Sequence, residues 1–421
     1  MKTALRGFFQ RYGVALQYPE FRHLWVANAF AQAAAWGLIV IRSSIIYSET
    51  HSSSLVGIAV FAALIPQLII PPIAGVLADR MDRRTLLSWT YGVNSVQNGA
   101  LFVLALTGVI EVWMLIAFSV LNGVARSAQM PVSQAMSASL VPREHLLNAL
   151  SLSASTQHGS RLIGPGIVTP LLALVGAAPA FLACTIFYLI GWYKILQLTP
   201  REPASGQRES FIDNFKGGFV YVYSRPVLRF MLVIVFLHCG LTMAFESLLP
   251  AFSVHNLGTS EEAGIGPLLM AVGFGAFISS VLISGIQTSK GRGNAMILTG
   301  VISGLGQVAL SMTGTLYMAV PAAALMGGAQ AAFMTMGQAV TQSIATDEFR
   351  GRVASINTFS LGGVMATMNL LNGSLADEFG AEPLLFIQGF IFFGAMVLSL
   401  FLLTGRRVYG RAPVLEPAAA A

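Results

Sequence analysis

The sequence predicts an all-α membrane protein with twelve transmembrane helices arranged as two six-helix bundles. Of its 421 residues, 55% are hydrophobic and only 10% are charged, which leaves too little polar surface to cover a soluble protein of this size. Apolar stretches of about 20 residues, the length that crosses the hydrocarbon core of a bilayer, recur along the chain. The basic residues fall in alternate loops, and the two halves of the chain resemble each other.

Twelve stretches have the length and composition of membrane spans. The first begins after four basic residues and is itself long enough to cross a membrane, so we expect a first transmembrane helix and no cleavable signal peptide. The expected spans are residues 24–47, 55–77, 86–108, 112–136, 148–175, 178–198, 228–252, 265–287, 294–314, 317–341, 353–375 and 383–404.

The basic residues predict the orientation of these spans. Of the 24 Lys and Arg, three (Arg42, Arg126 and Arg161) lie inside spans, and the other 21 lie at or near span ends on the side of the N-terminus. The loops on the opposite side hold acidic residues and histidines but no Lys or Arg. Cytoplasmic loops of inner-membrane proteins are enriched in Lys and Arg, so both termini are expected in the cytoplasm. The net charge of +6 therefore reflects topology, and no nucleic-acid partner is expected.

The longest polar interval, residues 199–227, divides the chain six spans plus six. It separates an N-terminal bundle (1–198) from a C-terminal bundle (228–405), which a tail (406–421) follows. Residues 133–152, SQAMSASLVPREHLLNALSL, align with residues 337–356, GQAVTQSIATDEFRGRVASI, at an offset of 204. Parallel repeats of this kind build several transporter folds.

A charged hinge, GVLADRMDRR at Gly75–Arg84, lies between the second and third spans. Its pattern resembles the cytoplasmic loop of the major facilitator superfamily, which implies the major facilitator fold over essentially the whole chain. The resemblance implies a cytoplasmic gate, although Asp82 replaces a usual glycine. The alternative is that the charges only set topology. The expected gate residues are Gly75, Asp79, Arg80, Arg83 and Arg84, with Asp347, Arg350 and Arg352 of the tenth-to-eleventh loop.

Two further motifs are similar to those of exporters in this superfamily. Arg126 and Gln129 in the fourth span resemble an Arg-x-x-Gln-Gly pattern of proton-coupled members, with Met130 in place of the glycine. An arginine in a span is costly and normally faces a cavity or a partner, so we expect Arg126 to take part in coupling. In the fifth span, Gly164, Pro165 and Gly166 resemble a Gly-Pro motif of antiporters. They favour a helix bend, and a tight helix crossing is the alternative.

Glu246 is the only carboxylate well inside an expected span. Such a residue is a functional candidate, and we expect it to take part in proton coupling. Arg42 lies at a similar depth in the first span, the repeat-equivalent of the seventh, so the two side chains could pair. The alternative is that each side chain reaches water.

Scattered polar and aromatic side chains predict a wide and mostly apolar central cavity. Arg161 and His158 lie one turn apart on the same face of the fifth span, and the cationic Arg161 favours anionic or catecholate-like substrates. Packing between helices is the alternative role for the polar side chains. The expected cavity residues are Gln32, Trp36, Asn98, His158, Arg161, His238 and Gln338.

The sequence predicts a transporter and no enzyme, because it has no phosphate-binding loop, no His-Glu-x-x-His and no Gly-x-Ser-x-Gly. No cofactor or metal site is expected, since Cys184 and Cys239 lie in apolar surroundings. We expect a monomeric, proton-coupled exporter of small amphipathic molecules in the inner membrane, similar to macrolide-type drug and siderophore exporters. A lipid flippase and a nutrient importer are the alternatives, and a membrane sensor is a more distant one.

Overall fold

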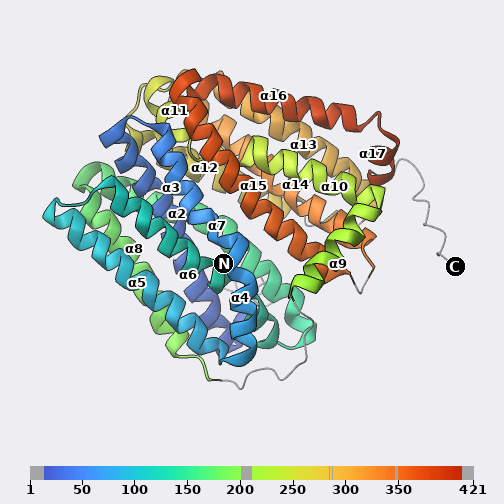
Figure 1. Cartoon of the computed structure of the whole chain (residues 1–421), viewed down its shortest axis with the longest axis horizontal. Coiled ribbons are helices and arrows are strands. Elements are labelled where there is room, and N and C mark those ends of the chain that lie inside the picture. The colour runs from blue at the N-terminus through green and yellow to red at the C-terminus, as the bar shows by residue number, and fades with distance from the viewer. Residues whose placement is uncertain (1–13, 201–210, 284, 287, 347–348, 410–421) are drawn as a thin grey trace, which may run out of the picture.

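A computed structural model describes residues 14–200, 211–283, 285–286, 288–346 and 349–409, and this part of the chain is helical without strands. Two bundles lie side by side, with the first in blue and green and the second in yellow and red (Figure 1). Short 3-10 turns occur at Val14–Gln17 and Arg143–His145. The helices of the first bundle are α2 (Pro19–Thr50), α3 (Ser53–Leu64), α4 (Pro66–Arg80), α5 (Arg83–Thr107), α6 (Val112–Ser139), α7 (Leu146–Val175) and α8 (Ala177–Leu196).

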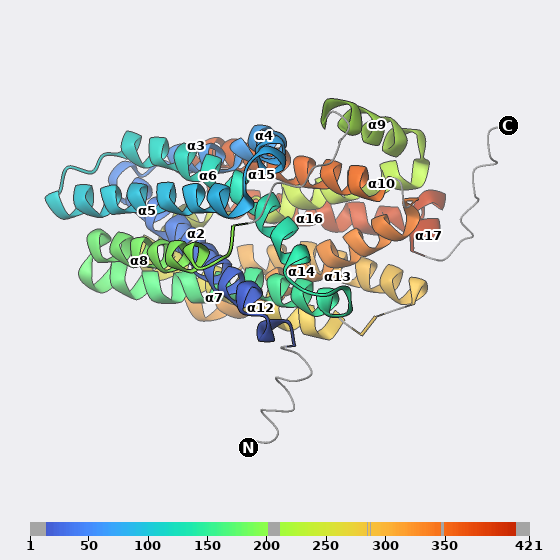
Figure 2. The same ribbon diagram turned by 90° about the horizontal axis from the view of Figure 1, so that it is seen from below.

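A connecting helix, α9 (Phe211–Ser224), lies outside both bundles and packs on the second one (Figure 2). The second bundle begins with a broken element, in which α10 runs into a π-helical turn and, after residues 244–248, into α11. Its elements are α10 (Pro226–His238), η3 (Cys239–Met243), α11 (Leu249–His255), α12 (Glu261–Ile283), α13 (Ser289–Ser311), α14 (Leu316–Ile344), α15 (Arg350–Phe379), α16 (Ala381–Ser399) and α17 (Leu403–Val408).

Eight helical stretches are long and apolar enough to cross a membrane, which confirms a multi-span helical protein. The other four expected spans fall on α5, α6, α7 and α15, which are 25, 28, 30 and 30 residues long. At about 1.5 Å per residue these helices also reach across a bilayer. They are more polar because they carry many of the interior amides and arginines. The total of twelve spans and the cytoplasmic termini stay predictions.

Charge distinguishes the two ends of the helices. Arg80, Arg84 and Lys194 lie at the ends of α4, α5 and α8 on one side, which we call the basic side. Asp377 and Glu382 lie where α15 ends and α16 begins, on the opposite side, which we call the acidic side. In Figure 1, α11 lies at the acidic end, and α9 and α17 lie at the basic end.

The two bundles contact each other most closely in the half of the membrane next to the acidic side. Helix α3 packs against α15, and α7 packs against α12 (Figure 1). Glycines permit this approach, since a Cβ on Gly57 of α3 would lie 2.7 Å from the carbonyl oxygen of Asn369 in α15. A Cβ on Gly266 of α12 would collide with Thr169 of α7. By contrast, a Cβ on Gly75, near the basic end of α4, would meet nothing within 4 Å.

Candidate functional site

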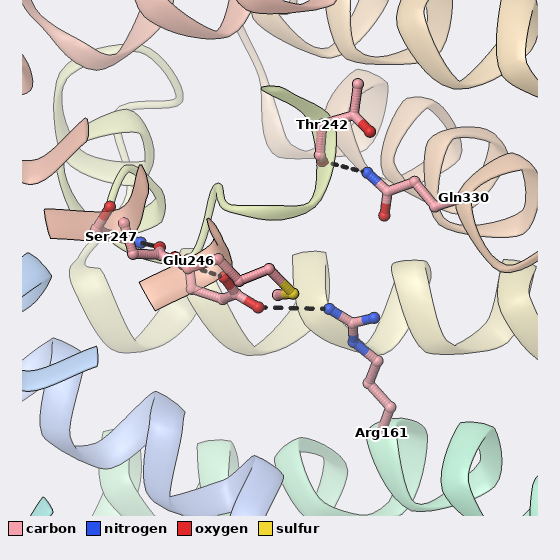
Figure 3. A network of polar contacts seen from close by, with 7 residues as sticks. Arg161, Thr242, Glu246, Ser247 and Gln330 are labelled. Atoms are coloured by element: carbon pink, nitrogen blue, oxygen red, sulfur yellow. Dashed lines mark hydrogen bonds and ion pairs between the residues drawn. The ribbon is translucent and has the colours of Figure 1, made fainter. Parts of the chain in front are cut away.

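An ion pair joins the two bundles near the middle of the interface (Figure 3). The Nη2 atom of Arg161, from α7, lies 3.9 Å from Oε1 of Glu246, and the two side chains are 12% and 5% exposed. The guanidinium of Arg161 also lies over the ring of Trp36 in α2, 4.1 Å from its centroid. Stacking on an aromatic face stabilises a desolvated cation. The first bundle thus supplies the cation and its aromatic support, and the second bundle supplies the carboxylate.

Glu246 lies in the irregular segment between the π-helical turn and α11. Its Oε2 accepts a hydrogen bond of 3.0 Å from the side-chain amide of Asn369 in α15. The same Asn369 accepts, through Oδ1, the backbone N–H of Ser247 at 3.1 Å. Asn369 therefore fixes both the carboxylate and the backbone that carries it.

The break in this helix frees backbone carbonyls inside the membrane, where an unsatisfied polar group is costly. Side-chain amides of three neighbouring helices donate to them. Gln330 of α14 donates to Thr242 O at 2.5 Å (Figure 3), and Asn372 of α15 donates to Ala244 O at 2.6 Å. Gln307 of α13 donates to Leu241 O at 2.9 Å. These amides hold the broken helix in place. This is the role in packing between helices that was the alternative for the interior polar side chains.

A cavity of about 420 Å³ lies between the bundles in the half nearer the basic side. Its walls come from α2, α6 and α7, with Tyr188 from α8 and Gln338 from α14 of the second bundle. Arg126 carries the only charge among the described residues that line it. The lining consists of Trp25, Asn28, Ala31, Gln32, Arg126, Gln129, Met130, Ser133, Gln134, Ser137, Leu150, Ser153, Ala154, Thr156, Gln157, Tyr188 and Gln338.

Arg126 is held by a neutral partner. Its Nη2 donates to Oε1 of Gln32 at 2.8 Å, while its Nε is buried without a hydrogen-bond partner. No carboxylate in the described part of the chain lies within ion-pair distance of it. Arg126 therefore presents an unneutralised charge to the cavity.

Two of the seven expected cavity residues line the cavity, namely Gln32 and Gln338. Arg161 and Trp36 lie outside it, at the bundle interface, where they contact each other. His158 is half-buried on α7 and is absent from the cavity lining that the structure describes. Whether any of these residues touches substrate stays a prediction.

The structure corrects the placement of Asn98 and His238. Asn98 is fully buried inside the first bundle and donates to Asn94 O at 2.7 Å. His238 is fully buried inside the second bundle, where its Nε2 lies 3.2 Å from the hydroxyl of Ser303 and its ring packs near Phe333. Polarity in a span predicts an interior position, but it does not distinguish the cavity from the core of a bundle.

The pairing of Arg42 with Glu246 that the sequence left open does not form in this conformation. Arg42 is 5% exposed, and its electrostatic neighbours are Tyr188 and Cys184 of α8. It points into the first bundle, while Glu246 faces Arg161. Similar depth in the membrane gave no information on the direction of the side chain.

The charged hinge makes its described contacts within its own bundle. Arg84 donates through Nη2 to Leu196 O at 2.7 Å. Asp82, the departure from the family pattern, caps α5 by accepting the backbone N–H groups of Arg84 and Thr85 at 3.3 and 3.1 Å. Arg80 is exposed and Arg83 is half-buried.

Part of the expected gate lies outside the described residues. This holds for Asp347 and for the side chains of Asp79 and Arg350. Arg352 lies over the ring of Phe349, 5.0 Å from its centroid, and faces Gly217 and Gly218 of α9. The latch therefore stays a prediction.

The Gly-Pro segment of α7 favours the tight-crossing alternative. Helix α7 is continuous from Leu146 to Val175 although it contains Pro165 and Pro170. A Cβ on Gly164 would collide with the carbonyl of Ala33 in α2, and one on Gly166 would lie 3.3 Å from Met270 of α12. Glycine is thus required at position 164 for close helix packing.

A contact between the bundles on the acidic side was not predicted from the sequence. Asp377, at the end of α15 beyond the expected span, accepts the backbone N–H groups of Ser53 and Ser54 at 2.6 and 3.0 Å and the hydroxyl of Ser52 at 2.9 Å. Partial burial raises the pKa of Asp377, but these hydrogen bonds outweigh burial and leave its pKa below the ordinary value. The carboxylate caps the N-terminus of α3 from the other bundle.

A second contact reinforces this side. The hydroxyl of Tyr47, near the end of α2, lies 3.0 Å from Nε2 of His255 in α11. The signal for the Asp377 contact was the serine run at residues 52–54, typical of a helix start. Sequence alone does not pair that run with an aspartate more than 300 residues away.

Comparisons with known proteins agree with this architecture. Residues 14–407 match the family described as transmembrane secretion effectors of the major facilitator superfamily. The chain is 25% identical to the staphyloferrin A transporter of Staphylococcus aureus, over 80% of this chain and 85% of that protein. It is 22% identical to macrolide efflux protein A of Streptococcus pyogenes, over 88% and 92%. It is 25% identical to the enterobactin exporter of Shigella boydii, over 86% and 89%.

Solved structures share the fold. A mutant of the nucleoside transporter NupG superposes with a TM-score of 0.73 at 10% identity, over 90% of this chain and 99% of that one. A transporter of the POT family in complex with 5-aminolevulinic acid gives a TM-score of 0.72 at 10% identity, over 90% and 95%. At these identities the likeness concerns the fold alone.

Proposed function

We propose that this chain, which belongs to the transmembrane secretion effector family of the major facilitator superfamily, exports small amphipathic molecules by alternating access in exchange for protons. Proteins of this superfamily are transporters, so the chain is a multi-pass transporter of the inner membrane and not an enzyme. The relatives named as exporters act on macrolides and on siderophores. We extend to this chain the direction of transport and the small-molecule class of substrate.

The observation that carries the proposal is the asymmetry of the bundle interface. On the acidic side, Gly57 contacts Asn369 and Asp377 caps α3, so the bundles are joined there. In the other half, a cavity around Arg126 is lined by the first bundle and reaches the second bundle at Gln338. With the basic side placed in the cytoplasm, this conformation is the inward-facing state of an alternating-access cycle.

The pair of Arg161 and Glu246 offers a route for proton coupling. Each partner belongs to a different bundle, so their attraction favours the arrangement in which the bundles touch at this level. Protonating Glu246 removes one of the two charges and thereby changes the balance between the inward-facing and outward-facing states. In the outward-facing state, the hinge around Asp79 and Arg80 would latch the basic side to the loop that contains Asp347.

Everted proteoliposomes test the proposal. Vesicles with an acidic interior are offered a panel of dyes, macrolides and catechol siderophores, and an exporter accumulates at least one of them only while the pH gradient lasts. Collapsing the gradient with an ionophore is the control. Uptake of a nutrient without any export would favour an importer, and redistribution of lipid alone would favour a flippase. Ligand-dependent signalling without flux would point to a sensor.

A further inference from the structure

The cavity near the basic side differs from the pair of Arg161 and Glu246 because its cation has no counter-charge among the described residues. Glu246 is the only carboxylate well inside the expected spans, and it faces Arg161. Arg126 alone carries charge among the described cavity residues. An arginine inside the membrane requires a partner or a polar cavity. The charge of Arg126 is therefore available to a ligand.

The neighbours of Arg126 stiffen the site without neutralising it. Gln32 accepts one guanidinium N–H at 2.8 Å, and its amide is uncharged. Asn28 accepts hydrogen bonds from Tyr91 at 3.1 Å and from Ser133 at 3.0 Å. Gln129 donates to the same Tyr91 hydroxyl at 2.9 Å. The wall around the cation is thus a fixed network of neutral groups.

The remaining lining supplies both apolar and polar surface. Trp25 is oriented by a hydrogen bond of 3.2 Å from its Nε1 to Leu152 O, and Ala31, Met130, Leu150 and Ala154 add apolar surface. Amides of Gln134, Gln157 and Gln338 lie among them. A volume of about 420 Å³ accommodates a compound of drug-like size.

We infer that this cavity binds a small amphipathic anion whose paired oxygens, from a carboxylate or a catecholate, contact the guanidinium of Arg126. A planar guanidinium matches two oxygens of one anionic group, and its charge strengthens both hydrogen bonds. The described lining offers no carboxylate to a cationic ligand, so it discriminates against amines. This inference rests on the proposed export function, because it names the substrate class of the same cavity. It assigns Arg126 to substrate binding instead of coupling.

Binding of three probes that share one ring tests the inference on purified full-length protein in detergent. The probes are naphthoate, neutral naphthamide and cationic naphthylmethylamine, measured by equilibrium dialysis without a gradient. We expect naphthoate to bind about tenfold more tightly than the amide, and the amine to bind more weakly than either. Arg126→Gln should abolish the preference for naphthoate, while Arg126→Lys should retain part of it.

Arg229→Gln is the matched control, because Arg229 is an exposed arginine on α10 outside the cavity lining. Its binding should equal that of the unmodified protein. If benzoate alone displaces naphthoate, the cavity is a carboxylate site. If dihydroxybenzamide alone displaces naphthoate, the cavity is a catecholate site. Either result supports the inference.

Equal binding of the three probes, tighter binding of the amine or absence of saturable naphthoate binding would overturn the inference. A preference that survives in Arg126→Gln would also overturn it. Gradient-driven export of cationic compounds only would overturn the anion site and leave the export function standing. Anion binding without any gradient-driven flux would overturn the export function and leave the anion site standing.

Discussion

Arg126 and Arg161 belong to the same bundle but have different surroundings. Arg161 lies at the interface with the second bundle, stacked on Trp36 and 3.9 Å from Glu246. Arg126 lies against the cavity, with Gln32 as its hydrogen-bond partner and without a carboxylate among the described residues. The cost of an arginine in the membrane is offset by a built-in partner in one case and by a polar cavity in the other.

This difference separates two roles. A built-in partner from the other bundle makes the interaction depend on the relative position of the bundles, which suits a switch. An unneutralised charge in a cavity makes the interaction depend on what enters, which suits a binding site. The two arginines should therefore respond differently when each is neutralised.

Neutralising Arg161 should have the largest effect on stability. Arg161→Gln leaves the carboxylate of Glu246 buried without its cation, and breaking a buried pair costs about 3–5 kcal/mol. We expect the lower end of this range because the pair is 3.9 Å apart and Arg161 is 12% exposed. Arg126→Gln, the matched control, leaves no charge unpaired and should be neutral or stabilising.

Chemical or thermal unfolding in detergent measures the stability of both variants. The double variant Arg161→Gln/Glu246→Gln should recover most of the loss, as a double-mutant cycle would detect. Equal destabilisation by Arg161→Gln and Arg126→Gln would show that Arg161 has no special partner.

The next largest effect is expected at the glycine contact on the acidic side. In Gly57→Val, the new Cβ would lie 2.7 Å from Asn369 O, and overpacking of this kind costs about 1–3 kcal/mol. The substitution should separate α3 from α15 and favour the state that is open on the acidic side. Transport should fall by about tenfold or more, since about 1.4 kcal/mol changes a population tenfold.

Gly394→Val in α16 is the control, because a Cβ there meets nothing within 4 Å. Labelling of a cysteine introduced at Ser54 should increase in the Gly57→Val background and not in the Gly394→Val background. Unchanged labelling in both would contradict the closure that we assign to the acidic side.

Asp377→Asn should have a smaller and pH-dependent effect. The substitution keeps one acceptor oxygen but removes the charge at the N-terminus of α3, which is worth about 0.3–1 kcal/mol, and we expect the lower part of this range because Asp377 is largely exposed. The pKa of Asp377 is lowered in the folded protein, so its contribution is complete above the ordinary value of about 3.9 and is lost as the pH falls below it.

Melting temperatures of the unmodified protein and Asp377→Asn should therefore differ by a constant amount from about pH 5 to pH 8 and converge below about pH 4. A difference that grows on acidification would have the wrong sign for this contact.

Asp82→Ala should have the smallest effect on transport. Asp82 caps α5 within its own bundle, and its loss costs about 1 kcal/mol of stability. Because the capping bonds hold only the first turn of α5, the pH dependence of transport should stay unchanged. A changed pH dependence would instead assign Asp82 to the gate.

The general architecture could be predicted from the sequence because it depends on composition and periodicity. Apolar stretches predicted an all-helical membrane protein, which the structure confirms, while the division into six plus six spans stays a prediction. The break between α10 and α11 was not predicted. Gly240 lies in the π-helical turn and Pro250 in the first turn of α11, but a glycine and a proline ten residues apart do not by themselves specify a break. The freed carbonyls are satisfied by amides from other helices, which the local sequence does not reveal.

The candidate site could be predicted only in part. Glu246 and Arg126 were found because a charge in an apolar span is conspicuous. Their partners were not, because depth along a helix does not give direction around it. The same limit explains Arg42, which faces the interior of its own bundle, and His238, which packs near Phe333.

Glu246, as the proton-sensitive partner of Arg161, should determine whether export responds to the pH gradient. Substrate export is compared between the unmodified protein and Glu246→Gln in everted proteoliposomes, with and without an imposed pH gradient. We expect the gradient to accelerate export by the unmodified protein, whereas Glu246→Gln should export only down the substrate gradient, at one rate under both conditions. Acceleration of Glu246→Gln by the pH gradient to the same extent as the unmodified protein would contradict this role of Glu246.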